Sequence, residues 1–353
     1  MCYPSSSQKT SVISIAYSIA ILLCILLSSC AISISTNSFG GSTGPSSVGL
    51  GAQNVQIFVE PEAGEHTITN AIAGAKKSVW LEMYLLTDRN VIRALEEAAH
   101  RGVDVRVMLE AHPYGSAAPT QTLDRLRAAG VQAQTTNPSF ALTHEKGMLI
   151  DGSIAYIMTA NFTLSALGGS SSTRNREYGI IDSNPQDVQA VSDIFNADWS
   201  RADAHLSDPN LVVSPINSRN VFTSLINNAH GTLLIEAEEM NDTNIEQAVV
   251  SAARRGVHIQ VILPASSASS GDSNSQGIQT IRQGNVQVRE DTHLYMHAKV
   301  IVVDGQRAFV GSENISAASL DQNRELGIII SEPNVLSTLQ QTFQRDWEDS
   351  HSL

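Results

Sequence analysis

The sequence is short of cysteine, and this shortage excludes several kinds of chemistry. Its 353 residues include three cysteines, Cys2, Cys24 and Cys30, all within the first thirty positions. The rest of the chain therefore has no disulfide framework, no thiolate metal site and no cysteine nucleophile. It also lacks the His-Glu-x-x-His pattern of helical zinc sites.

Basic residues are also scarce. The chain has 22 Lys and Arg against 35 Asp and Glu, which gives a formal net charge of −13. Such a balance argues against a protein that binds nucleic acid through a broad basic surface. The hydrophobic fraction of 42% is that of a globular protein, so general disorder is excluded as well.

The first thirty residues have the features of an export signal. No Asp, Glu, Lys or Arg occurs between Lys9 and Glu60, and residues 12–27 are almost wholly apolar. This apolar stretch is short for a membrane span, which needs about 20 residues, and its flanks are typical of a secretory signal. It ends in LSSC at 27–30, which resembles the lipobox of bacterial lipoproteins, where the signal is cut before a cysteine that then carries lipid.

Two outcomes stay open for this leader. It is a signal peptide over 1–30 with lipid on Cys30, or an uncleaved anchor that runs on to about Ile34. Both place the rest of the protein outside the cytoplasm and tethered to a membrane. Residues 31–51 are rich in Ser and Gly and uncharged, which predicts a flexible tether.

From residue 52 the chain alternates between strand and helix patterns and then repeats itself. SVWLEMYLLTD matches GTLLIEAEEMND with Glu82 opposite Glu236, and RALEEAAHRGVDVRVML matches QAVVSAARRGVHIQVIL at the same offset. Repeats are best settled first, and alternation of this kind predicts an α/β architecture. We therefore predict two copies of one α/β unit, over 52–206 and 207–353, with a site at their pseudo-twofold interface, because pockets favour such interfaces.

Each copy contains the pattern His-x-Lys-x4-Asp at the equivalent place. The residues are His144, Lys146 and Asp151 in the first half and His297, Lys299 and Asp304 in the second. The chain has only five lysines, so two chance copies are expected at a frequency of roughly 2 × 10⁻⁵. The segments that follow each lysine have strand character, which places His and Lys on one face.

An imidazole beside an ammonium group suits an anion such as phosphate. The aspartates fall on the opposite face of the strand, where they are better placed to hold the strand end. Further polar residues recur downstream, namely Thr159, Asn161 and Glu177 in the first half and Ser312, Asn314 and Glu325 in the second. A carboxylate beside an imidazole fixes its tautomer and raises its basicity, and Glu177 and Glu325 are the candidates for this task.

Together these motifs resemble the phospholipase D superfamily over nearly all of 52–353. The resemblance implies two α/β sandwich halves, each a mixed sheet flanked by helices, with both motifs meeting in one site. It implies that His144 attacks phosphorus to form a phosphohistidine, while His297 protonates the leaving alcohol and then activates water or another alcohol. The groups that hold the phosphoryl oxygens would be Lys146, Lys299, Asn161, Asn314, Thr159 and Ser312. No metal or cofactor is expected, since these donors stabilise the transition state themselves.

One position departs from the family's pattern. The Gly-Ser of the motif is Gly311-Ser312 in the second half but Met158-Thr159 in the first. We expect Met158 to narrow that side of the site and alter substrate fit. A degenerate copy without activity is disfavoured because both motifs are complete.

The choice of phosphodiester depends on weaker signals, and three of them favour lipid. The leader predicts a membrane surface, the acidic body would repel a polyanion, and the loops at 112–120, 168–173 and 266–277 are almost free of charge. We predict a phospholipase D that hydrolyses phospholipid head groups to phosphatidic acid, with phosphatidyl transfer to alcohols as a side reaction.

Three alternatives remain open. A cardiolipin or phosphatidylserine synthase shares the chemistry, an exported metal-independent endonuclease uses another substrate, and a phosphate-binding module would have no activity. Nucleic acid is the less favoured partner because of the acidic charge. With both motifs in one chain, a monomer completes the site.

Overall fold

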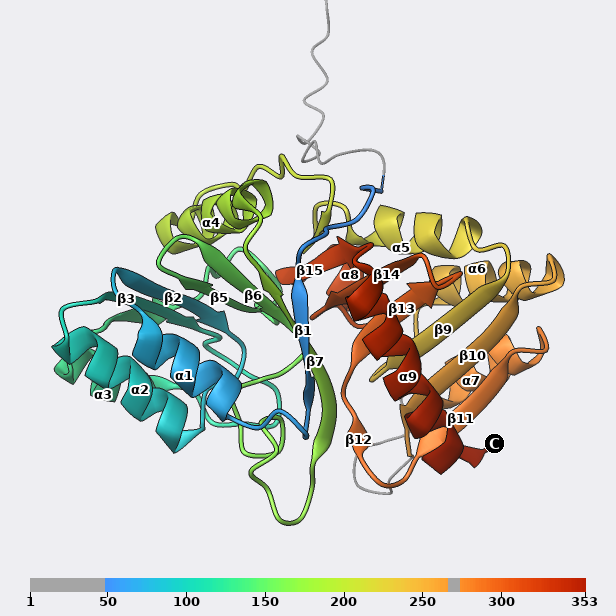
Figure 1. The fold of residues 1–353 in the computed structure, drawn as a ribbon, viewed down its shortest axis with the longest axis horizontal. Helices are drawn as coiled ribbons and strands as arrows, with labels where there is room; N and C mark the ends of the chain where they lie inside the picture. The colour runs from blue at the N-terminus through green and yellow to red at the C-terminus, as the bar shows by residue number, and fades with distance from the viewer. Residues whose placement is uncertain (1–47, 266–273) are drawn as a thin grey trace, which may run out of the picture. The chain divides into compact units, whose positions relative to one another are not determined.

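The structure is a computed structural model that describes residues 48–265 and 274–353 (Figure 1). The predicted signal peptide, Cys30 and most of the predicted tether lie outside the described residues, as does most of the 266–277 loop. In the part of the chain that is described, every helix is too short or too polar to cross a membrane.

The first half is built around one mixed sheet. Its strands are β1 (Gln56–Glu60), β2 (Ser78–Met83), β3 (Asp104–Leu109), β4 (Gln132–Thr135), β5 (Lys146–Ile150), β6 (Ile154–Met158) and β7 (Asn175–Asp182). Its helices are α1 (His66–Gly74), α2 (Arg89–His100), α3 (Thr120–Ala128) and α4 (Pro185–Ser200). The strand order is β1-β7-β6-β5-β2-β3-β4, with β2, β3 and β4 parallel to one another and the other neighbours antiparallel.

The second half repeats this plan. Its strands are β8 (Leu211–Ser214), β9 (Thr232–Ala237), β10 (His258–Pro264), β11 (Gln287–Asp291), β12 (Tyr295–Met296), β13 (Lys299–Val303), β14 (Arg307–Gly311), β15 (Glu325–Ile330) and β16 (His351–Ser352). Its helices are α5 (Ser218–Asn227), α6 (Thr243–Arg254), α7 (Ser275–Arg282), α8 (Ala317–Asp321) and α9 (Pro333–Asp349). The sheet order is β16-β11-β10-β9-β13-β14-β15-β8. The prediction of two mixed-sheet α/β halves is confirmed.

Helix packing follows the apolar spacing of the sequence. On α2, Val91, Leu95 and Ala98 recur at helical spacing and are all buried. With α1 and α3 they cover β2 and β3 in an outer core, while α5, α6 and α7 cover the second sheet in another (Figure 1). Asp88 and Asp242, at equivalent repeat positions, cap α2 and α6 by accepting hydrogen bonds from backbone N–H groups of the first turn.

A third core joins the two halves. It includes Val191 and Phe195 of α4 and Phe343 and Trp347 of α9, together with side chains of β5, β6, β7, β14 and β15. Because apolar residues of both halves fill one core, separating the halves would expose it to water. The described residues from 48 onward form one compact unit, and the boundary at residue 207 stays a prediction.

The chain also crosses between the halves next to each His-x-Lys motif. The short strand β12 pairs in parallel with β7 of the other half, with Tyr295 opposite Asn175. In the equivalent place, His144 N donates to Arg324 O at 2.8 Å, and Arg324 N donates to Leu142 O at 3.0 Å. Each motif histidine therefore lies within two residues of a backbone contact with the opposite half.

Candidate active site

The two motif histidines are each paired with the glutamate of the opposite half. Nδ1 of His144 lies 3.0 Å from Oε2 of Glu325, and Nδ1 of His297 lies 2.8 Å from Oε1 of Glu177. Both carboxylates are fully buried and both imidazoles are nearly so. A carboxylate on Nδ1 fixes the tautomer and leaves Nε2 as the nitrogen available for chemistry.

The crossing strands explain this exchange of partners. Asn175 of β7 is the pairing partner of Tyr295 in β12, and Tyr295 N donates to Arg174 O at 2.9 Å, so Glu177 on the same strand reaches the histidine that follows β12. The backbone contact of Arg324 with the segment before His144 places Glu325 equivalently. The sequence identified both glutamates, but the pairing across halves depends on how the two sheets meet.

Buried hydrogen bonds hold the two glutamates in place. Glu177 accepts from Thr159 Oγ1 at 2.6 Å and from Asn175 Nδ2 at 2.9 Å. Burial alone would raise the pKa of Glu177, but His297, Lys299 and the hydrogen bond from Asn175 outweigh it and hold the pKa below its ordinary value. The carboxylate is therefore charged when it faces the imidazole.

Glu325 is held in the same way by a serine that sequence reasoning missed. Ser319 Oγ donates to Glu325 Oε1 at 2.7 Å and accepts from Asn314 N at 2.8 Å. The pKa of Glu325 is also lowered, because His144, Lys146 and Ser319 together outweigh the effect of burial. Ser319 has no motif spacing to reveal it, since Thr159 performs the equivalent task from a different place in the first half.

The hydroxyls of Thr159 and Ser312 lie behind the glutamates. Thr159 Oγ1 donates to Glu177 and accepts from Tyr178 N at 2.9 Å. Ser312 Oγ accepts from Leu326 N at 3.0 Å, and the Ser312 carbonyl oxygen lies 3.2 Å from His144 Nδ1. Both residues are fully buried. Contact of these two hydroxyls with the substrate phosphate stays a prediction. The contacts that the structure shows help to orient the His297–Glu177 and His144–Glu325 pairs.

The two motif lysines lie at the start of matching strands. Lys146 opens β5 and Lys299 opens β13, both almost completely buried, and each Nζ donates to the carbonyl oxygen of its own motif histidine. Burial lowers the pKa of Lys146 to about 7, with repulsion from Lys299 adding to the effect and Glu325 opposing it. Burial, Lys146 and Lys299 also lower the pKa of His144, against the attraction of Glu325.

The lowered pKa of His144 bears on its role in the reaction. A lowered pKa keeps the His144 imidazole neutral at neutral pH, as a nucleophile requires. Asn161 and Asn314 are buried nearby, and within the described residues their Oδ1 atoms have no hydrogen-bond partner. Asn314 Nδ2 donates to Glu238 Oε2 at 3.3 Å.

The motif aspartates lie at strand ends, away from the imidazoles. Asp151, at φ 56°, accepts hydrogen bonds from the backbone N–H groups of Lys76, Lys77 and Ser78. Asp304 accepts three equivalent bonds from residues 230–232. Burial would raise the pKa of Asp151, but the three N–H donors outweigh it and lower the pKa. Each aspartate thus fastens the turn after its motif strand to the start of the neighbouring strand.

Met158 does not narrow the site, contrary to the expectation from the sequence. Its side chain is fully buried in the outer core of the first half. At the equivalent Gly311, an added Cβ would lie 2.4 Å from Gly327 Cα. The glycine of the second half is required by the close approach of β15, whereas the first half packs differently there.

A buried group of carboxyls lies beneath the site. Ligand atoms of Glu82, Glu145 and Asp198 all lie within 4.8 Å of one another. Burial raises the pKa of Glu82 well above its ordinary value and that of Glu145 to about 8, while Arg324 Nε lies 2.8 Å from Asp198. Protonation of the two glutamates and the positive charge of Arg324 both reduce the net negative charge of this cluster.

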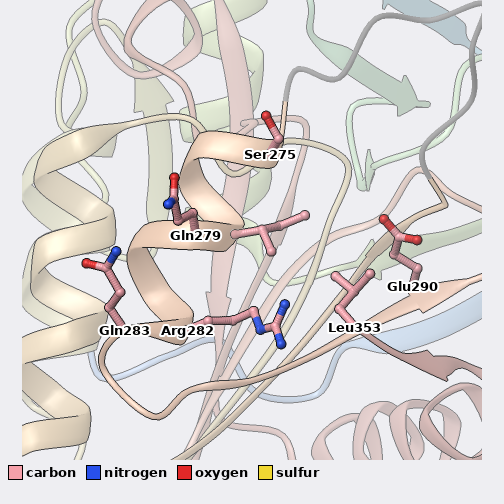
Figure 2. A pocket seen from close by; sticks show the side chains of 7 residues that line it. Ser275, Gln279, Arg282, Gln283, Glu290 and Leu353 are labelled. Atoms are coloured by element: carbon pink, nitrogen blue, oxygen red, sulfur yellow. The ribbon is translucent and has the colours of Figure 1, made fainter.

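Of two cavities in the described residues, one lies next to a motif histidine and the other is lined by no motif residue. One of about 390 Å³ lies beside Tyr84, whose ring packs edge-on against His144 with centroids 4.7 Å apart. The described residues that line it, from the ends of β2 and β3 and from the 113–122 segment, are all uncharged. Another, of about 550 Å³, lies between α7, β11 and Leu353 (Figure 2), and the described residues that line it include no motif residue.

The lowered pKa of Lys146 predicts pH-dependent anion binding. Sulfate keeps its charge across the neutral range, so its affinity reports the lysine. Because protonated Lys146 attracts the anion, affinity is highest below pH 7 and falls as the pH rises through about 7, by up to about tenfold per pH unit. Isothermal titration of sulfate between pH 6 and 9 measures this slope.

The matched variant is Lys146→Arg, because a guanidinium stays charged throughout this range. In this variant, sulfate affinity is expected to change much less with pH than in the wild type. An identical slope in the variant would show that another group titrates.

Comparisons with known proteins agree with this geometry. The family model described as "Cardiolipin synthase, PLD-like domain" matches residues 68–199 and 222–347, once in each half. Among curated proteins, the chain is 25% identical over 345 residues to a cardiolipin synthase of Oceanobacillus iheyensis, covering 84% of this chain and 69% of that protein. It is 23% identical over 338 residues to cardiolipin synthase A of Pseudomonas aeruginosa, covering 85% and 68%.

A solved structure shares the fold. The phosphatidylserine synthase of Haemophilus influenzae superposes with a TM-score of 0.67 at 15% identity, covering 86% of this chain and 89% of that chain. At this identity the likeness concerns the fold alone. The family model matches most of the chain in two copies, each of which contains one His-x-Lys-x4-Asp motif. The chain belongs to the phospholipase D superfamily of enzymes.

Proposed function

We propose that the protein is a phosphatidyltransferase of the cardiolipin synthase type, which moves a phosphatidyl group from one phospholipid to a hydroxyl group of a second, glycerol-bearing lipid. The observation that carries this proposal is the pair of imidazoles, each held through Nδ1 by a buried glutamate of the opposite half and each beside a buried lysine. Two such histidines can perform two successive displacements at phosphorus. The names of the relatives supply the acceptor class.

In the first displacement, Nε2 of His144 attacks phosphorus. A P–N bond forms while the P–O bond to the head-group alcohol breaks, and His297 gives its proton to the departing oxygen. Lys146, Lys299 and the two motif asparagines hold the phosphoryl oxygens, whose charge grows in the transition state. The neutral state of His144 supports this assignment of roles.

In the second displacement, the acceptor lipid provides the nucleophile. Its hydroxyl loses a proton to His297, which the first step left neutral, and the oxygen attacks the phosphorus of the phosphohistidine. The P–N bond breaks, His144 is restored, and a new phosphodiester leaves. Glu177 and Glu325 support both steps by stabilising the imidazolium forms of their partners.

The prediction of a head-group-hydrolysing phospholipase D was wrong. The curated relatives carry the name cardiolipin synthase, and the description of the family model does the same. Hydrolysis and transfer share the first displacement and differ only in whether water or an alcohol enters second. The motif residues are therefore the same for both reactions, and the sequence could not separate them.

Features around the site support a lipid substrate at a membrane. The uncharged cavity beside Tyr84 suits a glycerol or acyl portion rather than a second phosphate. The apolar leader and the LSSC sequence that ends at Cys30 support export and tethering of the enzyme at a membrane surface. Both motifs come from one chain, so a monomer is sufficient for the reaction.

The proposal predicts the products formed from phosphatidylglycerol. The full chain, incubated with phosphatidylglycerol vesicles in EDTA, is expected to yield cardiolipin and free glycerol in equal amounts. EDTA should have no effect because no step uses a metal. Thin-layer chromatography of the lipids and an enzymatic glycerol assay measure both products.

A matched control is His100→Ala, which removes an exposed histidine at the end of α2. It should leave the product yield unchanged. Phosphatidic acid without cardiolipin would contradict transfer to a lipid. Inhibition by EDTA that added metal restores would contradict the phosphohistidine chemistry.

A further inference from the structure

Glu238 reaches the catalytic groups of the second half from the end of β9. Its Oε2 atom lies 2.8 Å from Lys299 Nζ, 3.4 Å from His297 Nε2 and 3.3 Å from Asn314 Nδ2. Its Oε1 atom accepts a hydrogen bond from Tyr295 Oη at 3.2 Å. One carboxylate oxygen thus contacts a lysine, the reactive nitrogen of a histidine and an asparagine amide.

The proposed function assigns all three of these groups to the substrate phosphodiester: Lys299 and Asn314 to its phosphoryl oxygens, and His297 to its departing oxygen. A carboxylate and a phosphodiester each carry one negative charge and accept hydrogen bonds through oxygens, so they compete for the same donors. A phosphoryl group cannot occupy this position while the Glu238 carboxylate remains there.

The first half differs at the equivalent position. The repeat aligns Glu238 with Tyr84, and the ring of Tyr84 packs against His144 while Lys146 Nζ lies 5.2 Å from its centroid. Burial raises the pKa of the Tyr84 phenol, which is therefore neutral, and its oxygen accepts a hydrogen bond from Tyr114 N at 2.6 Å. Of the two equivalent positions, 84 and 238, the second therefore places an anion against the histidine and lysine of its own half, and the first places a neutral ring there.

A role for Glu238 as a proton carrier does not fit its surroundings. Burial would raise the pKa of the carboxyl, but His297 and Lys299 outweigh it and hold the pKa far below its usual range. A carboxylate that stays ionised at all working pH values acts through its charge and its position.

We propose that Glu238 is a specificity-determining residue that occupies the phosphoryl position of the second half, so that a phosphodiester binds by displacing its carboxylate from Lys299 and His297. This inference rests on the proposed function, which assigns Lys299 and Asn314 to the substrate phosphate. The displaced carboxylate stays in the site and repels the ligand in proportion to the ligand's charge. Glu238 therefore favours monoanionic phosphodiesters over dianionic phosphomonoesters.

The test compares two probes on the full chain in detergent micelles at pH 8. Inorganic phosphate is mainly a dianion at this pH, and dimethyl phosphate is a monoanion. Isothermal titration is expected to show that Glu238→Gln binds inorganic phosphate at least ten times more tightly than wild type. For dimethyl phosphate we expect about half the logarithmic gain, roughly threefold, because the repulsion scales with ligand charge.

The matched control is Glu239→Gln, which makes the same chemical change one residue along the chain, at a half-buried side chain. It should change either affinity by less than about twofold. Glu238→Tyr provides a second variant, because it introduces the residue of the first half, and it should tighten phosphate binding in the same direction. In Glu238→Gln the KM for phosphatidylglycerol should fall, while kcat changes less.

The outcomes separate this inference from the proposed function. Unchanged or weaker phosphate binding in both Glu238 variants, with transfer intact, would overturn the inference and leave the transferase standing. A large loss of kcat with unchanged phosphate affinity would also overturn it, because Glu238 would then act in the chemical step. Tighter phosphate binding in an enzyme that forms no cardiolipin would support the inference and reject the proposed acceptor.

Discussion

Replacing His144 with Ala will abolish phosphatidyl transfer and also cleavage of bis(p-nitrophenyl) phosphate. Loss of the nucleophile removes the covalent route itself, so we expect at least about a thousandfold decrease in kcat for both substrates. The fold should persist, because the imidazole contributes little to the cores of either half. Its Nδ1 partner Glu325 would still be held by Ser319.

His297→Ala is expected to behave differently with the two substrates. Natural lipids release a poor leaving group, so loss of the general acid should slow their cleavage by roughly 10²–10⁴. p-Nitrophenolate leaves without a proton, so the first displacement on the artificial substrate should continue. Without a base to activate the second nucleophile, the phosphohistidine should accumulate after one turnover.

Stopped-flow absorbance and intact-protein mass spectrometry test this division of roles. For His297→Ala we expect a burst of about one p-nitrophenolate per enzyme and a mass increase that is stable at alkaline pH. His144→Ala should show neither. A burst in His144→Ala that is absent from His297→Ala would reverse the two assignments.

The sequence locates the motif residues through a local signal. His and Lys two residues apart at the start of an apolar strand must share a face, and β5 and β13 have that form. The Asp after each strand has a positive φ and binds three backbone N–H groups. Spacing along one chain segment was enough for these features.

Contacts between residues far apart in the chain have no local sequence pattern that predicts them. The pairing of Glu325 with His144 spans 181 residues, and the contact of Glu238 with Lys299 spans 61. The repeat suggested that the halves meet, but not that β12 would cross to β7 and exchange the glutamates. Hydrogen bonds such as that of Ser319 depend on the final packing and have no counterpart in the sequence of the first half.

Two buried arginines, Arg176 and Arg324, each pair with an aspartate of the other half, and this pairing also could not be predicted from the sequence. Arg176 of β7 forms a bidentate pair with Asp346 of α9, with Nε–Oδ2 at 2.6 Å and Nη2–Oδ1 at 2.8 Å. Arg324 pairs with Asp198 of α4 at 2.8 Å, and its Nη1 donates to Ser214 O at 2.9 Å. Each pair joins one half to the other and is almost completely buried.

Arg324→Ala is expected to lower the free energy of unfolding by about 3–5 kcal/mol, since it leaves a buried carboxylate without its partner. The loss extends beyond one contact. Asp198 lies in the buried cluster of carboxyls with Glu82 and Glu145, and the positive charge of Arg324 offsets the negative charge of this cluster. Urea denaturation followed by tryptophan fluorescence at pH 7 measures the change, with Trp199 adjacent to Asp198 as a reporter.

Two further variants establish that charge, rather than size, causes the loss. Arg125→Ala removes an exposed arginine paired with Glu96, and we expect a change within about 1 kcal/mol. Combining Arg324→Met with Asp198→Asn removes both charges and should recover most of the stability, because a buried ion pair replaced as a whole costs little. A loss below about 1 kcal/mol in Arg324→Ala would show that this pair contributes little to holding the halves together. No recovery in the double variant would show that lost packing or hydrogen bonding, rather than an unpaired charge, causes the loss.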